Sequence, residues 1–247
     1  MIFKKKEKPT IQFVSTIPGL SLQKDILPYS AKKYSPSWWK DMPFSDNDIP
    51  TIKRCPAIPD LFSTGYIVPM WMDLEMNNMK ADGINADFKT NKYGTDFMDW
   101  SAHFPEQLTD SIDFQVANRK VEFLLKATAP WYVVTPRGWS TLVMPLSYEF
   151  TLDYTIIPGI VDTDVLHQMN HPMLVHSNGK SISFKRTDPF ICYIPFERTE
   201  YNMEIISDNQ KMSQYVLGQQ ETWSKYRNES KKQLGAYRRM QKERDRG

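Results

Sequence analysis

Histidines and aspartates cluster in one short stretch of this chain. Three of its four histidines fall within ten residues, directly after two aspartates. Imidazole nitrogens and carboxylate oxygens are the usual protein ligands of zinc and iron. The stretch therefore indicates a candidate site for a divalent transition metal, and its ligand set would be Asp162, Asp164, His167, His171 and His176.

The expected local structure brings these side chains together only in part. Asp162 and Asp164 share one face of a strand, because side chains alternate along it. His167 and His171 have the spacing of one helical face, but the proline after His171 disfavours helix there. A hairpin would bring Asp164, His167 and His176 together. The alternative is a polar loop at a barrel rim, with the histidines hydrogen-bonded to the aspartates.

No other motif with a known catalytic mechanism occurs. The chain has no Gly-x-Gly-x-x-Gly, no phosphate-binding loop and no Gly-x-Ser-x-Gly elbow. Its two cysteines, Cys55 and Cys192, are predicted to be reduced, buried and inert. Arg137-Gly138-Trp139 has the composition of a turn between two strands. These observations favour a protein that is not an enzyme.

Charge is spread unevenly along the chain. Residues 224–247 carry nine Lys or Arg against three acids, and residues 4–8 carry four Lys against one acid. Because the whole chain has a net charge of only +2, the body between these ends is acidic. In the C-terminal segment cations alternate with aromatic residues, which suits nucleic-acid phosphates and bases or an acidic groove on a protein. The candidate binding residues are Trp223, Lys225, Tyr226, Arg227, Lys231, Lys232, Tyr237, Arg238 and Arg239.

Short β-rich runs bounded by Pro or Gly follow one another along most of the chain. They predict strands at 11–14, 65–76, 121–127, 131–135, 139–144, 148–155, 160–164, 173–176, 182–185 and 190–194. Pro69 predicts a sheet edge or a bulge in the second of these. Asn178-Gly179 predicts a hairpin between 173–176 and 182–185. A short helix is expected around Trp38 and Trp39, at least one of which is expected to seal an edge of the core.

The chain is thus predicted to be mainly β. We expect a single jelly-roll or β-clip-like barrel or sandwich with a C-terminal α-helix. The expected organisation is a basic arm at 1–10, a β-rich domain at 11–200 and a basic helical segment at 201–247. No signal peptide and no apolar run of membrane-spanning length is found, which predicts a soluble protein of a reducing compartment with no membrane partner.

Five motifs carry a resemblance to a known family. They are KRCPAIPD at 53–60, GYIVPMW at 65–71, TPRGWS at 135–140, PGIVDTD at 158–164 and YIPF at 193–196. Together they resemble, over residues 10–198, a protein family of unknown function from tailed phages of marine bacteria. The resemblance implies a phage accessory or virion-associated protein, found in the cytoplasm of the infected bacterial host or in the virion.

A second resemblance is more local. Residues 158–164 are similar to the third motif of trimeric dUTPases, and 184–194 to the strand that follows it. Asp162 would stand where that family keeps its water-activating aspartate. Val165, Thr187 and Cys192 replace that family's tyrosine, glycine and glutamine, and its other motifs are absent. This resemblance implies a related β-clip fold without the catalysis.

The leading hypothesis is a non-enzymatic β-barrel protein that binds a phage or host protein through the barrel rim or the basic tail. A homo-oligomer is compatible with it. The alternative is a metal-dependent or nucleotide-processing enzyme that uses the His/Asp cluster. A second alternative is nucleic-acid binding through the basic C-terminal tail.

Overall fold

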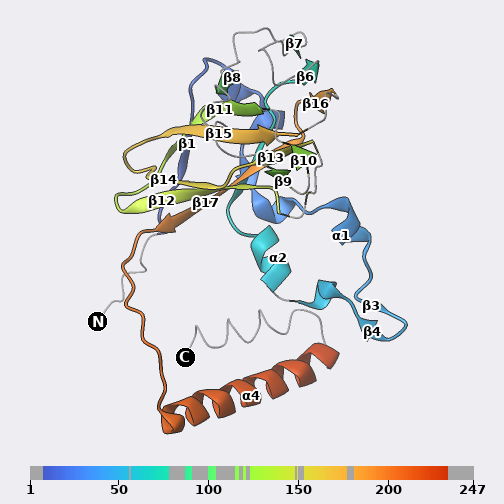
Figure 1. Cartoon of the computed structure of the whole chain (residues 1–247), viewed down its shortest axis with the longest axis vertical. Coiled ribbons are helices and arrows are strands. Elements are labelled where there is room, and N and C mark those ends of the chain that lie inside the picture. Colours follow the sequence, from blue (N-terminus) through green and yellow to red (C-terminus); the bar gives the residue numbers. More distant parts are fainter. Residues whose placement is uncertain are drawn as a thin grey trace. The chain divides into compact units, whose positions relative to one another are not determined.

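A computed structural model describes most of the chain. The described residues are 8–55, 57–77, 87–90, 100–103, 115–116, 119–120, 123–147, 149, 153–176 and 181–232. The chain divides into two compact units, Met1–Arg198 and Thr199–Gly247. The first is built mainly of antiparallel β-strands, and the second contains a long helix (Figure 1).

Two five-stranded antiparallel sheets form the centre of the first unit. The first sheet has the order β1 (Gln12–Ser15), β11 (Phe123–Val134), β15 (Gln168–Val175), β13 (Tyr154–Ile156), with β8 (Trp100–His103) also paired to β11. The second has the order β14 (Gly159–Val161), β12 (Trp139–Pro145), β17 (Pro189–Glu197), β5 (Tyr66–Pro69), β2 (Tyr29–Ser30).

The remaining strands are short. A three-stranded sheet has the order β16 (Ile182–Phe184), β6 (Leu74–Asn77), β7 (Asp87–Thr90), and two small pairs are β3 (Ser45–Asp46) with β4 (Ile49–Pro50) and β9 (Gln115–Val116) with β10 (Arg119–Lys120). The helices of this unit are α1 (Ser37–Asp41), α2 (Ala57–Phe62) and 3-10 turns at Leu20–Leu22, Lys24–Ile26, Ala31–Lys33 and Ile52–Arg54.

The two large sheets enclose one hydrophobic core. Alternation along β15 turns Met169, His171 and Met173 inward, while Asn170 between them is exposed. Inward residues of β11, such as Leu125 and Trp131, belong to the same core as those of β17 and β5. Burying each large apolar side chain here contributes about 1.5–3 kcal/mol. Figure 1 shows the strands β11 and β15 stacked over β12 and β17.

Of the tryptophan pair, Trp39 is the buried member, but it lies in a cluster separate from the main core. It is buried with Ile58 and Phe62 in a small cluster between α1 and α2, whereas Trp38 is exposed. Its ring meets that of Phe62 edge-on, with centroids 5.1 Å apart and an interplanar angle of 70°. Trp39 thus packs the short helix α1 against α2.

The strand predicted at 65–76 is interrupted. The structure has two strands, β5 and β6, in different sheets. Between them the backbone of Met70 bonds to the turn before β17, donating to the Asp188 carbonyl and accepting from the Thr187 N–H. The bulge predicted at Pro69 is confirmed, because the pairing of β5 with β17 shifts register between Pro189 and Ile191.

The hairpin predicted between 173–176 and 182–185 is wrong. The strand β15 is paired with β11 on one side and β13 on the other, so neither of its edges is available to β16. The strand β16 pairs with β6 in another sheet. Asn178 and Gly179 themselves lie outside the described residues. The two strands predicted at 121–127 and 131–135 are one long strand, β11, with an irregularity between Thr128 and Tyr132.

The predicted C-terminal helix is confirmed as α4 (Asn209–Lys232). The residue before it, Asp208, is its N-cap: the Asp208 carboxylate accepts a hydrogen bond from the backbone N–H of Lys211, 2.8 Å away. Within the described part of the chain, no helix is long and apolar enough to cross a bilayer.

Candidate functional site

A polar corner lies at one end of the two sheets. Three segments meet there: the β11–β12 connection at 135–138, the β14–β15 connection at 162–167, and Arg198, which follows β17. The Arg137-Gly138 turn does join two strands, as predicted, but these belong to different sheets. The corner therefore lies where the chain crosses from one sheet to the other.

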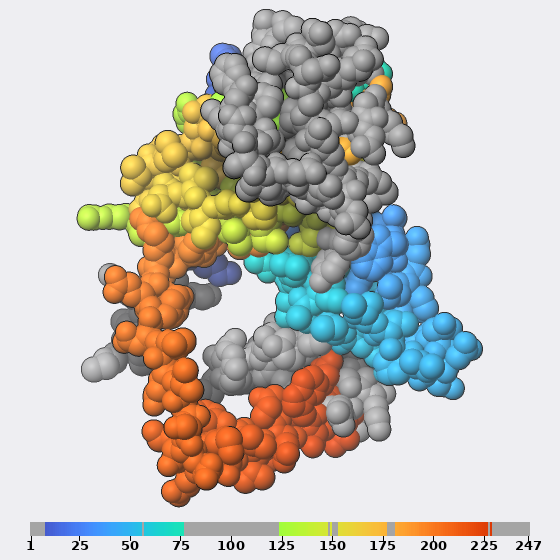
Figure 2. All heavy atoms as spheres, viewed as in Figure 1, coloured from blue at the N-terminus to red at the C-terminus, as the bar shows by residue number. Residues whose placement is uncertain are grey.

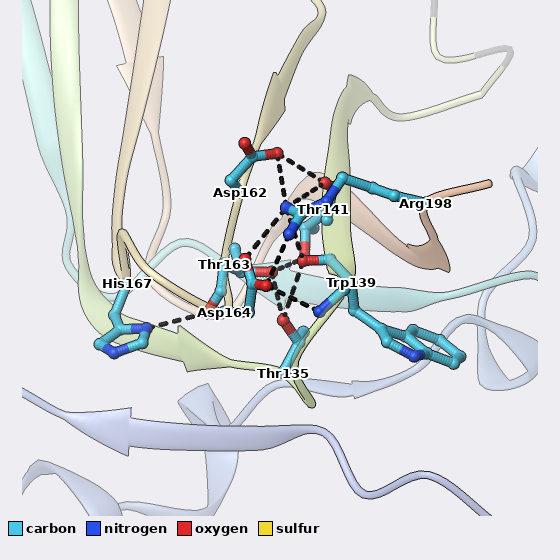
Figure 3. A network of polar contacts seen from close by, with 10 residues as sticks. Thr135, Trp139, Thr141, Asp162, Thr163, Asp164, His167 and Arg198 are labelled. Carbon is cyan, nitrogen blue, oxygen red and sulfur yellow. Dashed lines mark hydrogen bonds and ion pairs between the residues drawn. The ribbon is translucent and has the colours of Figure 1, made fainter. Parts of the chain in front are cut away.

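Arg198 is the centre of this corner. Its guanidinium contacts both oxygens of Asp164, at 3.0 and 2.6 Å, and one oxygen of Asp162 at 2.9 Å. Figure 3 shows it between the two carboxylates. Its backbone N–H donates to the Gly138 carbonyl at 2.7 Å, while the Gly138 N–H donates to Asp164 at 2.8 Å. The two-pronged contact with Asp164 fixes the guanidinium in one orientation.

Three buried threonines lie beneath the ion pairs. The Thr163 hydroxyl is 2.9 Å from the hydroxyls of both Thr135 and Thr141, so the three side chains satisfy one another. The Thr163 carbonyl accepts from His167 Nδ1 at 2.8 Å (Figure 3). A buried hydroxyl without a partner is destabilising, and this chain of contacts prevents that.

The carboxylates of the corner are held in the ionised form. Hydrogen bonds from Ser140 and then Arg198 lower the pKa of Asp162. The Arg198 contact and the Gly138 N–H lower the pKa of Asp164, whose side chain is 5% exposed against 60% for Asp162. The same pairs raise the pKa of Arg198. A carboxylate with a lowered pKa is a weak general base, so this arrangement suits structural anchoring better than activation of water.

The structure does not gather the five predicted metal ligands. Only the two aspartates lie together, on Arg198. His167 bonds to the Thr163 carbonyl, His176 Nε2 lies 3.0 Å from the Thr155 hydroxyl, and His171 points into the core. Among the described residues, no three His, Cys, Asp or Glu side chains are placed to hold a metal ion. The structure thus does not bring Asp162, Asp164, His167, His171 and His176 together as one ligand set.

The separation of the histidines from the aspartates has a physical reason. A strand, β15, runs through residues 168–175, so His171 and His176 do not follow the hairpin that the sequence suggested. His171 falls on the inward face by alternation, while His167 remains in the connection before the strand. Arg198, which pairs with both aspartates, was missed because it lies 34 residues from Asp164 in sequence.

A buried His–Tyr pair joins the two sheets. His171 of β15 and Tyr193 of β17 are both fully buried, and their rings stack with centroids 5.6 Å apart at 11°. His171 Nδ1 donates to the Ala127 carbonyl at 2.9 Å, which leaves Nε2 to accept from the Tyr193 hydroxyl at 2.6 Å. Burial lowers the pKa of His171 to about 4 and raises that of Tyr193. Both rings are therefore neutral at pH 7.

The two cysteines differ. Both are free thiols. Cys192 is buried, and burial raises the pKa of its thiol to about 11, which makes it unreactive as expected. The expectation that Cys55 is buried is wrong, because Cys55 is exposed.

The predicted binding residues of the tail are described in part. Trp223 and Lys225 are exposed on α4, and the Trp223 ring meets that of Tyr226 edge-on with centroids 5.6 Å apart. Arg227, Lys231 and Lys232 belong to α4, but their side chains lie outside the described residues. The same holds for the whole of Tyr237, Arg238 and Arg239.

Large apolar side chains are exposed along the second unit. They are Tyr201, Met203, Ile205, Ile206, Met212, Tyr215, Val216, Leu217 and Trp223. On α4 a hollow is lined by Tyr215, Val216, Gln219, Gln220, Trp223 and Ser224. Exposed apolar surface of this extent is typical of an interaction site.

Comparison with known proteins assigns no family: no protein-family model matches the chain, and no curated protein is similar to it.

Proposed function

We propose that this chain is a non-enzymatic binding protein. Its β-rich unit, Met1–Arg198, is the scaffold, and the binding part is the segment from Thr199 through α4. The observation that carries the proposal is the row of nine large apolar side chains exposed between Tyr201 and Trp223. Arg198 supports it, because the ion pairs with Asp162 and Asp164 fix the point at which the binding segment begins.

Several groups in the described part of the β-rich unit support a scaffold role. The carboxylates of the polar corner are paired with Arg198, His171 is hydrogen-bonded inside the core, and the pKa of Cys192 is raised. Each of these groups has a structural partner or environment that accounts for it. A barrel rim that binds a partner remains part of the proposal, with the exposed side chains of Ile160, Val165 and Leu166 beside the polar corner as its apolar surface.

The resemblance to the tailed-phage family supplies the biological setting of the proposal. We place the protein among phage accessory or virion-associated proteins, made in the cytoplasm of the infected host. A jelly-roll or β-clip-like arrangement, related to the dUTPase fold, belongs to the same proposal. The support for it is that two antiparallel sheets share one core and that the chain crosses between them at Gly138.

The test is a comparison of interaction partners in lysates of infected cells. Full-length protein would be compared with Tyr215→Ser/Trp223→Ser, which removes two rings of the exposed surface. The matched control is Gln214→Ser/Thr222→Ser on the same helix, which leaves the residues that line the hollow unchanged. We expect the same protein to be captured by wild type and control and lost from the aromatic variant. Capture that is unchanged in the aromatic variant would contradict the proposal, and mass spectrometry of purified particles tests packaging.

Nucleic-acid binding is the second candidate function. The exposed Trp223 beside Lys225 favours it, because an aromatic ring can stack on a base while cations contact phosphates. Binding of single-stranded DNA would weaken steeply with salt and would be lost in Trp223→Ser. Affinity that is independent of salt would eliminate this candidate.

A further inference from the structure

The segment between the polar corner and α4 has the pattern of a β-strand. Tyr201, Met203 and Ile205 alternate with the polar residues Asn202 and Glu204. The three apolar side chains are 87%, 87% and 81% exposed. Residues 199–208 are assigned to no helix, strand or turn, and in Figure 2 the orange atoms of this part of the chain form a narrow column. Residues 199–207 form no strand pairing within the described part of the chain.

A strand of this kind is stable only when its backbone is paired. Its N–H and C=O groups, and one apolar face, are complementary to the open edge of an existing sheet. Residues 199–206 contain neither glycine nor proline, and the structure records no turn among them. An extended segment of this length reaches about 25 Å, which is enough to extend from one molecule to another.

The strand β1 offers the best edge for it. Among the described strands β1 pairs only with β11, so its other edge has no strand partner there. Ile11 and Phe13 are only partly buried, although they pack against the core from this edge, while Gln12 and Val14 face outward and are exposed. An added strand with apolar residues on its inner face would complete the burial of Ile11 and Phe13.

Charge complementarity favours an antiparallel direction and this edge. The segment carries Glu200, Glu204 and Asp208 and no cation, whereas β1 is preceded by the exposed Lys8 in a lysine-rich sequence. Antiparallel pairing with Met203 opposite Phe13 places Lys8 in register with Asp208. The edge strand β14 is less suitable, because its three residues are followed directly by Asp162 and Asp164.

We propose that residues 200–206 add as an antiparallel strand to β1 of a second copy of this chain. Each molecule has both the donor segment and the acceptor edge, so reciprocal exchange closes a two-fold dimer in which no segment and no β1 edge is left unpaired. The inference deepens the proposed function: it assigns one part of the exposed surface to self-association and leaves α4 for the other partner.

The first experiment is sedimentation equilibrium of the full chain. The test variant is Met203→Asp, and the control is Asn202→Asp, which adds the same charge on the outward face. We expect a dimer for wild type and control, and a dimer dissociation constant raised at least about tenfold in Met203→Asp, as loss of one buried apolar side chain requires. A monomeric wild type, or a dimer that persists in Met203→Asp, overturns the inference.

The second experiment fixes the register. In a Cys55→Ser background, Val14→Cys with Asn202→Cys is expected to form a disulfide between two chains, because these outward positions lie opposite each other in the proposed pairing. The control pair Val14→Cys with Met203→Cys places the thiols on opposite faces and is expected to remain reduced. A disulfide formed within one chain overturns the second copy as the partner. Partner capture that depends on Tyr215 and Trp223 is measured separately, so either proposal can fail alone.

Discussion

The buried His171 makes the stability of this protein depend on pH. In the folded chain His171 is neutral because burial lowers its pKa from 6.5 to about 4. The unfolded chain binds a proton at this residue below about pH 6.5, whereas the folded chain binds it only below about pH 4. Acid therefore favours unfolding in this window. The loss of unfolding free energy from this one residue is about 2 kcal/mol at pH 5 and approaches about 3 kcal/mol near pH 4.

The assay is urea unfolding followed by fluorescence of the seven tryptophans, between pH 7.5 and pH 4.5. The comparison variant is His171→Phe, which cannot titrate. At pH 7.5 it should be less stable by about 1–3 kcal/mol, because the Tyr193 hydroxyl and the Ala127 carbonyl lose their partner. The difference in unfolding free energy between the two proteins should shrink as the pH falls, because only wild type loses stability through His171. Carboxylates that titrate near pH 4 contribute equally to both proteins.

Two results would refute this reasoning. One is a difference in stability between wild type and His171→Phe that stays constant from pH 7.5 to pH 4.5. The other is an imidazole NMR titration of folded protein with a His171 midpoint near 6.5. Tyr193→Phe is the control for the hydrogen bond, because it retains the titrating ring and should keep a pH-dependent loss of stability.

Three further predictions concern the polar corner, the glycines and the thiols. Replacing Arg198 with Met leaves the nearly buried Asp164 without its cation, so the melting temperature should fall by several degrees. Arg137→Met on the exposed turn is the control and should change the melting temperature little. An unchanged melting temperature in Arg198→Met would contradict the anchoring role. Gly65 has φ +82° and a Cβ there would lie 2.2 Å from the Tyr193 carbonyl oxygen, so Gly65→Ala should destabilise by about 4 kcal/mol or more. Gly138 has φ +84° with open space around it, so Gly138→Ala should cost only about 1–2 kcal/mol in urea unfolding, and equal losses would be inconsistent with the clash. A thiol reagent should modify Cys55 at once and Cys192 only after unfolding, and a fast reaction that survives Cys55→Ser would be the contrary result.

The strands that the sequence predicts best are those whose faces are decided locally. Runs such as 139–144 and 190–194 fall within β12 and β17, because Pro and Gly bound them and β-branched or aromatic residues fill them. The C-terminal helix was also predictable, since 209–232 contains no proline. Pairing was not: Asn178-Gly179 has the composition of a hairpin turn, yet β16 pairs elsewhere because both edges of β15 are occupied.

In the candidate site, too, the contacts between residues close in sequence were predictable and those between distant residues were not. The sequence identified Asp162 and Asp164 as a pair on neighbouring positions, and the structure does bring them onto one cation. It could not identify Arg198 as that cation, because only the end of β17, returning beside β12, brings the guanidinium there. The histidines lie apart for the opposite reason. They are close in sequence, but the alternation along β15 places His171 in the core.

The polar corner and the exposed segment are adjacent in the chain and are best considered together. Arg198 satisfies two carboxylates at the end of the sheets, and the next residues present their apolar side chains to solvent. An exposed row at Tyr201, Met203 and Ile205 is unfavourable in an isolated molecule, because each side chain forgoes burial worth about 1.5–3 kcal/mol. The ion pairs of Arg198 anchor the start of this segment, and its strand-like sequence is suited to pairing with a partner. If Arg198→Met weakened dimerisation without unfolding the sheets, the anchor and the segment would be shown to act together.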